Sequence, residues 1–299
     1  MDLRSLRSLP KSDLHNHCLL GGQRSVIEKH LGSKIPAFRA QNTGIGDLNQ
    51  WIGTSLRPFF QMPGAFEKAV EAAFLQAKFD GITRLEMSID VMFGSIFHVP
   101  AEKIVKVLSH YHREVAPDIE FLPELGFPRN KSVRLLLASF EPFLDLNYFK
   151  SIDLYDDEFA QPIMNFKELY RFARSRGMKC KAHAGEFGSA DSVKEAVETL
   201  ELDAVQHGIG AADSPEVMRW LADHHIPLNV CPTSNIKLKR VRSYKTHPIR
   251  ILFDHGIKVT INTDDVLVFG DGVSEQYQKL FKTGVFSLNE LEIIRCNGL

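Results

Sequence analysis

The sequence contains little cysteine and almost no net charge, and each shortage excludes a class of protein. The four cysteines among its 299 residues are scattered and form no C-x-x-C pair. This spacing excludes a disulfide framework and a thiolate zinc site, and it is typical of a reducing compartment. A formal net charge of −1 indicates neither a nucleic-acid surface nor a polybasic membrane patch. The cysteines are Cys18, Cys180, Cys231 and Cys296.

Long apolar runs are also absent. No segment approaches the roughly 20 apolar residues that a membrane helix requires, and the first residues, Met1 to Arg7, contain no apolar run of signal-peptide length. With 44% hydrophobic and 24% charged residues, the composition is that of a soluble globular protein with ample apolar material for a core. We find no internal repeat and no linker, and we expect a cytoplasmic protein that forms a single domain over residues 1–299.

The chain alternates short apolar runs with longer helical patterns. Between the runs, apolar residues recur at the i, i+3, i+4, i+7 spacing of a helix with one buried stripe. Eight strands and intervening helices over about 250 residues predict a (β/α)₈ barrel, a TIM barrel. A doubly wound sheet of the Rossmann type would favour a G-x-G-x-x-G motif after a strand, and none is present. The predicted strands are Leu14–His17, Ile82–Ile89, Ile119–Pro123, Phe149–Leu154, Met178–His183, Ala204–His207, Ile226–Val230 and Ile257–Asn262.

Local signals mark helix ends. Ser214-Pro215-Glu216 has a capping residue, a proline at the first helical position and an acid in the first turn, so it predicts a helix start. Gly177 and Gly256 precede the fifth and eighth strands, where a helix should end. The chain ends at Asn297-Gly298-Leu299, so we expect either that the sequence is truncated or that the closing helix is small.

One connection is unusually long. Residues 18–81 separate the first and second strands, more than one strand–helix unit needs. A long helical insertion on the catalytic face of a barrel is typical of a lid or pocket wall. The alternative is that its aromatic residues form a small core of their own, and for any single one this is the more frequent outcome. These apolar residues include Trp51, Leu56, Phe59 and Phe60.

Metal-binding residue types occur at the ends of several predicted strands. His15 and His17 are two residues apart, so both imidazoles point to one face of a strand. His183, His207 and Asp264 end the fifth, sixth and eighth strands. A single histidine is usually structural, but strand ends of this barrel meet at one rim, where its active sites lie. The convergence of all five residues predicts a metal site there.

The residue types also indicate the metal and its chemistry. Three neutral imidazoles and a carboxylate suit one Zn²⁺, whereas calcium and magnesium favour more oxygen ligands. Zinc lowers the pKa of a bound water toward 7 and supplies hydroxide at neutral pH. Glu186, three residues after His183, is placed to donate a proton, which leaves His207 and Asp265 to take the water's proton and hold substrate.

In this order the motifs resemble those of the adenosine deaminase branch of the metal-dependent amidohydrolases. The resemblance extends from about residue 9 to the end of the chain, and the ordered set is far more specific than any one motif. The matching pieces are Asp13-Leu14-His15-Asn16-His17, His183-Ala184-Gly185-Glu186, His207-Gly208, Cys231-Pro232-Thr233-Ser234-Asn235, His247-Pro248 and Thr263-Asp264-Asp265.

The resemblance implies a role for each site residue. The zinc ligands would be His15, His17, His183 and Asp264. Glu186 would protonate the purine nitrogen beside the attacked carbon, and His207 with Asp264 would orient and deprotonate the water. Asp265 would bind the imidazole side of the purine, and the Gly185 region would line the base pocket. The implied activity is hydrolytic deamination of an adenine-type ring, in adenosine or a related purine nucleoside or base, with release of ammonia.

Two positions depart from the pattern of this family. After the first two histidines the family has Leu-Asp-Gly, with an acid for the sugar 5′ hydroxyl, whereas this chain has Cys18-Leu19-Leu20-Gly21-Gly22. After the fourth strand Asp156 replaces a glycine whose backbone approaches the base. A donor left without a partner costs about 1–3 kcal/mol, so both changes affect specificity. We expect Asp156 to crowd or hydrogen-bond whatever occupies the purine site.

Two other functions stay open on the sequence alone. The same site could hydrolyse a different amino-heterocycle or C–N bond, although Glu186 favours a ring that needs protonation. A catalytically inactive relative could serve as a binding protein, but that would favour a broken ligand set. We expect a small purine-like substrate and no nucleic-acid or membrane partner, and the sequence leaves the oligomeric state open.

Overall fold

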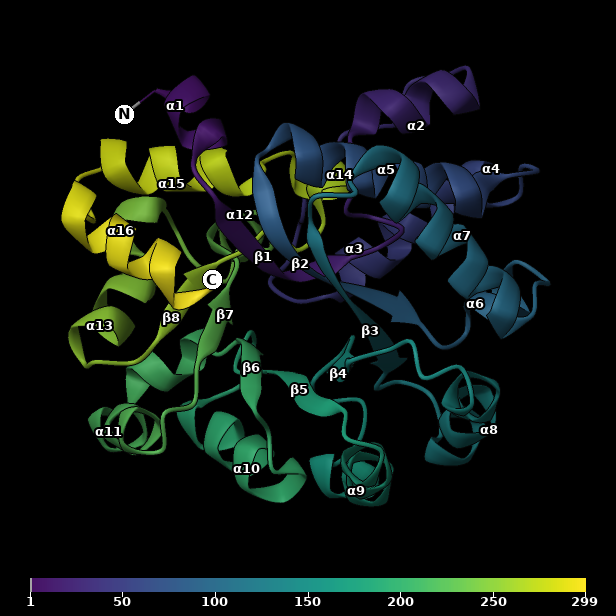
Figure 1. Cartoon of the computed structure of the whole chain (residues 1–299). Helices are drawn as coiled ribbons and strands as arrows, with labels where there is room; N and C mark the ends of the chain where they lie inside the picture. Colours follow the sequence, from purple (N-terminus) through teal and green to yellow (C-terminus); the bar gives the residue numbers. More distant parts are fainter. Residues whose placement is uncertain (1) are drawn as a thin grey trace.

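Eight parallel strands follow one another in chain order around the centre of the molecule (Figure 1). The computed structural model describes residues 2–299. Each strand pairs with the next, and β8 approaches β1 through a bridge between Asn16 and Asp264, so the barrel is nearly closed. The predicted (β/α)₈ barrel is confirmed. The strands are β1 (Lys11–His17), β2 (Ile82–Asp90), β3 (Glu120–Pro128), β4 (Ser151–Tyr155), β5 (Lys179–Ala184), β6 (Ala204–His207), β7 (Leu228–Val230) and β8 (Val259–Ile261).

Helices surround the barrel (Figure 1). The helix predicted at Ser214 begins there, because the Ser214 side chain accepts a hydrogen bond from the N–H of Val217 and caps the first turn. Among residues 2–299, no helix has both the length and the apolar character to span a membrane. The helices are α1 (Leu3–Ser8), α2 (Arg24–Leu31), α3 (Gly46–Trp51), η1 (Ile52–Leu56), α4 (Arg57–Phe60), α5 (Ala65–Phe79), α6 (Phe93–Ile96), α7 (Ala101–Val115), α8 (Val133–Leu144), η2 (Ile163–Phe166), α9 (Lys167–Ser175), α10 (Ala190–Leu200), η3 (Ile209–Asp213), α11 (Pro215–Asp223), α12 (Pro232–Lys237), η4 (Tyr244–Thr246), α13 (Ile249–Asp254), α14 (Val266–Phe269), α15 (Val273–Lys282) and α16 (Leu288–Asn297).

Five strands, β3, β4, β5, β7 and β8, begin later than the apolar runs predicted, and three of these shifts have one cause. Met178, Ile226 and Ile257 each donate their N–H to a carbonyl five residues earlier, at 3.2, 3.0 and 3.3 Å. The residue before each of them is left-handed, as at Gly177 and Gly256, with φ of 76° and 79°. This geometry closes the preceding helix, so these apolar residues belong to helix ends.

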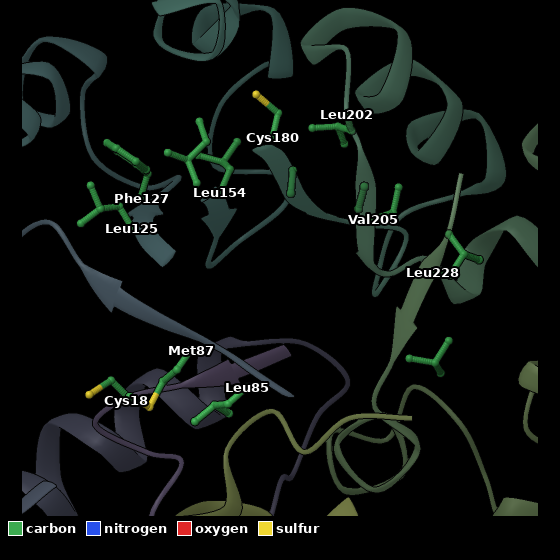
Figure 2. Packing of buried hydrophobic residues seen from close by; sticks show 14 of the residues in the cluster. Cys18, Leu85, Met87, Leu125, Phe127, Leu154, Cys180, Leu202, Val205 and Leu228 are labelled. Atoms are coloured by element: carbon green, nitrogen blue, oxygen red, sulfur yellow. The ribbon is translucent and has the colours of Figure 1, made fainter. Parts of the chain in front are cut away.

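Alternation along the strands separates an apolar shell from a polar interior. In β5, Cys180 and Ala182 face the helices, whereas Lys181 and His183 face the barrel axis and are almost fully buried. Figure 2 shows Leu154, Cys180 and Val205 packed between the strands and the surrounding helices. The polar interior of the barrel is therefore held in place by an apolar layer around it.

The segment between β1 and β2 has two parts. Its last helix, α5, packs against β2 and α7 and takes the place of the ring helix for that strand pair. Before it, α2, α3, η1 and α4 lie on the β1–β2 side of the barrel (Figure 1). Leu56 and Phe59 belong to a separate buried cluster with Leu267. For these two residues the structure matches the alternative that they form a small core of their own. Phe60, in contrast, lines the main cavity.

Candidate active site

Four of the predicted ligands direct donor atoms into one volume at the carboxyl ends of the strands. The Nε2 atoms of His15 and His183 lie 3.1 Å apart. Oδ1 of Asp264 lies 3.4 Å from His17 Nε2 and 3.9 Å from His15 Nε2. All four residues are largely buried. The structure therefore brings together a three-histidine, one-carboxylate set drawn from β1, β5 and the end of β8.

The outer nitrogens of these rings have their own acceptors. His183 Nδ1 lies 3.2 Å from Asp153 Oδ1, and His15 Nδ1 lies 3.3 Å from the carbonyl oxygen of Asn229. Donation from both Nδ1 atoms leaves the lone pairs on Nε2. Two such lone pairs 3.1 Å apart repel each other unless a cation or proton lies between them. The donor set therefore fits a borderline divalent cation.

Burial shapes the protonation of the same rings. It lowers the pKa of His17 to about 3, and with neighbouring imidazoles it lowers the pKa of His15 well below 6.5. Burial by itself would lower the pKa of His183. The negative charge of the adjacent Asp153 carboxylate outweighs this effect and raises the pKa to about 9. A cation held here would meet two imidazoles that are already neutral and would displace a proton from His183.

A second group of acids adjoins the ligand set. His207 Nε2 lies 3.6 Å from Glu186 Oε1 and 3.8 Å from Asp264 Oδ2, too far for hydrogen bonds. Within residues 2–299, Glu186 Oε1 and Asp265 Oδ1 are buried and have no hydrogen-bond partner. Burial and the Asp264 charge raise the pKa of both carboxyls well above their usual range. The raised pKa favours the protonated form of Glu186, the form that can donate a proton.

A cavity of about 520 Å³ opens onto these groups, within the usual range of small-molecule pockets. The predicted residues that line it are His17, Asp156, His183, Glu186, His207, Asp264 and Asp265. His15 lies behind them with 1% of its surface exposed, and Gly185 is also outside the lining. Much of the remaining wall is apolar, including Leu19, Leu20, Ile52, Phe60, Phe93 and Ile96.

Gly185 holds the turn after His183. Its φ is 68°, and a Cβ atom at this position would lie 2.3 Å from Val193 Cγ2. Its N–H donates to Glu158 Oε2 at 2.7 Å, and the N–H of Phe187 donates to the other oxygen at 2.8 Å. Glu158 thus fixes the loop that carries Glu186.

Asp156 has both carboxylate oxygens hydrogen-bonded to protein amides. Its Oδ1 accepts from Asn49 on α3 at 2.9 Å, and its Oδ2 accepts from Asn130 after β3. The φ of Asp156 is 79°, a conformation that costs a non-glycine residue about 1–3 kcal/mol. The side chain joins the β1–β2 segment to the opposite rim of the cavity and is turned to these amides.

Backbone strain also marks two catalytic candidates. His207 has a φ of 64° and Asp264 a φ of 61°. His207 follows Gln206, which is hydrogen-bonded inside the barrel to Asn229, so strict alternation would turn His207 outward. The left-handed conformation ends the alternation and is compatible with the inward imidazole.

Several supporting residues were not predicted as site residues. Asp153 orients His183, Glu158 holds the Gly185 loop, and Asn235 and His247 are linked to His207. Asn235 and His247 lie within the matched motifs, so the sequence marked them, but it indicated no function for them. For Asp153 and Glu158 the available signal was an acid within β4 or shortly after it.

Comparison with known proteins places this arrangement among deaminases. The family model described as "Adenosine deaminase" matches residues 137–299. A Treponema pallidum protein provisionally named adenosine/adenine deaminase is 33% identical over 95% of both chains. An adenine deaminase of Rhodopseudomonas palustris is 29% identical over 100% of this chain and 91% of its own.

Solved structures share the fold. The adenine deaminase of Arthrobacter aurescens superposes with a TM-score of 0.84 at 24% identity, covering 97% of this chain and 92% of its own. An amidohydrolase of Burkholderia ambifaria with bound zinc has a TM-score of 0.82 at 23% identity, covering 98% and 85%.

Proposed function

Because this chain belongs to the adenosine deaminase family of hydrolases, which act on C–N bonds of a purine ring, we propose that it is a zinc-dependent aminohydrolase that deaminates an adenine-type ring. The product is the hypoxanthine-type ring, and ammonia is released. The observation that carries the proposal is the convergence of His15, His17, His183 and Asp264 beside a buried Glu186, whose carboxyl pKa burial raises.

His15, His17, His183 and Asp264 would hold one zinc ion per chain. Three imidazoles and one carboxylate are ligands that zinc favours, and the zinc in the Burkholderia ambifaria neighbour supports this assignment. When bound, the zinc ion lowers the pKa of a water molecule toward 7 and thereby supplies hydroxide at neutral pH.

The remaining residues move protons and hold the ring. Glu186 donates its proton to the ring nitrogen beside the amino-bearing carbon, which makes that carbon electrophilic. His207 and Asp264 orient the attacking water and take its proton. Asp265, whose buried Oδ1 is free of protein partners within residues 2–299, binds the imidazole side of the purine, and the Gly185 loop positions Glu186 against the ring.

The cavity walls favour a free base or an uncharged nucleoside over a nucleotide. The carboxyl side chains of Asp90, Asp156 and Glu186 line the cavity together with Asp264 and Asp265, and Lys131 is the one cationic lysine or arginine among the described lining residues. With a single lysine available to pair with it, a phosphate is disfavoured. Leu19 and Leu20 occupy the wall where the family places an acid, so a polar 5′ hydroxyl has no carboxylate partner from this segment.

We also propose that residues 1–299 form one barrel domain and that residues 18–81 include its lid. The part ahead of α5 supplies Leu48, Asn49 and Ile52 to the cavity wall. It contacts loops that follow other strands through the hydrogen bond from Asn49 to Asp156 at 2.9 Å and through Lys239, which donates to the carbonyl oxygen of Gln41 at 2.8 Å. A loop of this kind sequesters the reaction from water when it closes.

An ammonia-release screen tests the proposal directly. Purified protein should contain about one zinc per chain and release ammonia from adenine, from adenosine or from an adenosine with an apolar 5′ group, and more slowly from AMP. Glu186→Gln should abolish release without changing the zinc content. A fully zinc-loaded protein that released ammonia from none of these compounds would overturn the proposal, and zinc loss in Glu186→Gln would reassign that residue.

A further inference from the structure

A chain of buried side chains leads from the helix α13 to His207. The N–H of Ile249 donates to His247 Nδ1 at 3.1 Å. His247 Nε2 lies 3.2 Å from Asn235 Oδ1, and Asn235 Nδ2 lies 3.2 Å from His207 Nδ1. The three side chains are at most 2% exposed, so water does not compete for these bonds.

The direction of every bond in this chain follows from its first member. A backbone N–H can only donate, so His247 Nδ1 is an acceptor and the proton of that ring is on Nε2. His247 therefore donates to the Asn235 oxygen, which leaves the Asn235 amide group to donate to His207 Nδ1. A His207 ring that accepts at Nδ1 has its proton on Nε2.

The position of Asn235 is itself held by the backbone. Its carbonyl oxygen accepts from the N–H groups of Arg240 and Val241 at 2.9 and 3.0 Å. His247 is anchored in the same way, through its N–H to the carbonyl of Tyr244 at 3.2 Å. The backbone of both middle members of the relay, Asn235 and His247, is thus held in place.

We propose that Asn235 and His247 are positioning residues that lock His207 in the Nε2–H form, so that His207 donates a hydrogen bond to the attacking oxygen and Asp264 accepts the proton. The inference rests on the proposed deamination and sharpens the shared role given to these two residues. The geometry agrees, because Asp264 directs Oδ1 to His15 and His17 and leaves Oδ2 3.8 Å from His207 Nε2.

The proton balance is complete with these residues alone. An O–H bond of water breaks, its proton goes to Asp264 Oδ2, the oxygen bonds to the amino-bearing carbon, and Glu186 gives its proton to the adjacent ring nitrogen. The C–N bond then breaks, the leaving amine takes the proton from Asp264, and the hydroxyl proton of the adduct returns to Glu186. His207 keeps its proton throughout and stabilises the charge on the oxygen.

The tautomer of His207 can be measured without turnover. Nitrogen-15 NMR of histidine-labelled, zinc-loaded protein, with the His207 signals assigned by their loss in His207→Gln, should show protonated Nε2 and unprotonated Nδ1. The opposite tautomer in the wild-type protein would overturn the inference, whatever substrate the protein uses. The absence of ammonia release, in contrast, would bear on the proposed function and leave this measurement valid.

Asn235→Asp reverses the relay while almost preserving its shape. A carboxylate accepts from His247 and also from His207, so His207 should switch to the Nδ1–H form. We expect kcat to fall about 10²- to 10³-fold, the range for loss of one donor to a developing anion, with KM little changed. Gln276→Glu is the matched control, because Gln276 is also a buried amide but bonds to Thr233 N and Asn262 O, away from His207.

His247→Phe provides a second test that introduces no charge. Without the His247 donor, the Asn235 amide can rotate, and His207 should populate both tautomers with a smaller fall in kcat than in Asn235→Asp. An unchanged His207 tautomer in both variants, or a kcat in Asn235→Asp no lower than in Gln276→Glu, would show that these residues serve only packing and would overturn the proposal.

Discussion

Two clusters of buried ionisable side chains share the interior of this barrel, and they differ in how completely their hydrogen bonds are formed. In the lower cluster, Lys181 Nζ lies 2.6 Å from Glu86 and 2.5 Å from Glu124, and it also reaches the carbonyl oxygen of Leu14. Ser151 donates to Glu124 at 2.7 Å. Each charged group there has a partner of opposite charge.

The upper cluster, at the strand ends, is left open. Among the described residues, Glu186 Oε1, Asp265 Oδ1 and Asp153 Oδ2 have no hydrogen-bond partner, although Asp153 Oδ2 lies within ion-pair distance of His183. Buried polar atoms are almost always paired in folded proteins, so unpaired ones require a reason. The same barrel thus contains a closed network that fits a structural role and an open one that fits ligand binding. Perturbed pKa values alone do not separate them, since they occur in both clusters.

The largest effect should come from removing one ligand of the upper cluster. His17→Gln should lose zinc and lower kcat by roughly 10³-fold or more, because a metal ion contributes several kcal/mol to such reactions. The free energy of unfolding in the presence of a chelator should change little, because no hydrogen bond of the described fold depends on the His17 ring. Zinc analysis, ammonia release and urea unfolding test this. Retained zinc with full activity would remove His17 from the ligand set.

The converse change falls on the lower cluster. Lys181→Met leaves Glu86 and Glu124 buried without their cation, so we expect about 3–5 kcal/mol less stability in urea unfolding. Zinc stoichiometry should be unchanged. Adding Glu86→Gln and Glu124→Gln to Lys181→Met should restore most of the lost stability, because the triple variant leaves no buried charge without a partner. A stable Lys181→Met protein that had lost its zinc would contradict the division into two clusters.

Asp153 is the acid of the upper cluster that supports one of the ligand histidines. It is fully buried in β4, and its carboxylate holds the Nδ1 side of His183. Asp153→Asn should weaken zinc affinity about 10- to 100-fold, the usual cost of losing such an outer partner of a metal-binding histidine. Competition with a chromophoric chelator measures this. Asp80→Asn, a buried acid that accepts from the N–H of Ser274, is the control and should leave zinc affinity unchanged.

The upper cluster was more predictable from the sequence than its supports. Strand number and order are readable from apolar runs, and the carboxyl ends of parallel strands converge, so the sequence alone places His183 and Asp264 together. The starts of β5, β7 and β8 were misplaced because Met178, Ile226 and Ile257 close helices with their N–H groups. Periodicity carries no information on that choice.

The supports depend on contacts between distant segments. Asn235 and His247 act on a histidine that precedes them by 28 and 40 positions, through bonds whose direction is set by one backbone N–H. Asp156 was expected to crowd or hydrogen-bond whatever occupies the purine site. It lines the cavity, and its carboxylate accepts from Asn49 and Asn130, which lie 107 and 26 residues earlier. No local pattern contains these pairings.

The smallest effect is expected outside the barrel, where an ionisable group is paired but partly exposed. At the start of α16, Ser287 and Glu290 cap each other's backbone, and hydrogen bonds from the Ser287 N–H and hydroxyl lower the pKa of Glu290 to about 2. Because the folded pKa is below the unfolded one, this stabilisation is present above about pH 4.5 and is lost as the pH falls toward 2.

Ser287→Ala should cost about 1 kcal/mol of folding stability near neutral pH. Glu290→Gln keeps an acceptor and removes the charge, so its Tm should lie slightly below wild type at about pH 6 and converge with it by about pH 2. Glu216→Gln, an exposed acid in the first turn of α11, controls for charge. A Tm difference for Glu290→Gln that persisted unchanged over this pH range would show that the cap does not depend on the ionised carboxylate. The charge of a fully paired acid would then add nothing to the free energy of unfolding where water reaches it.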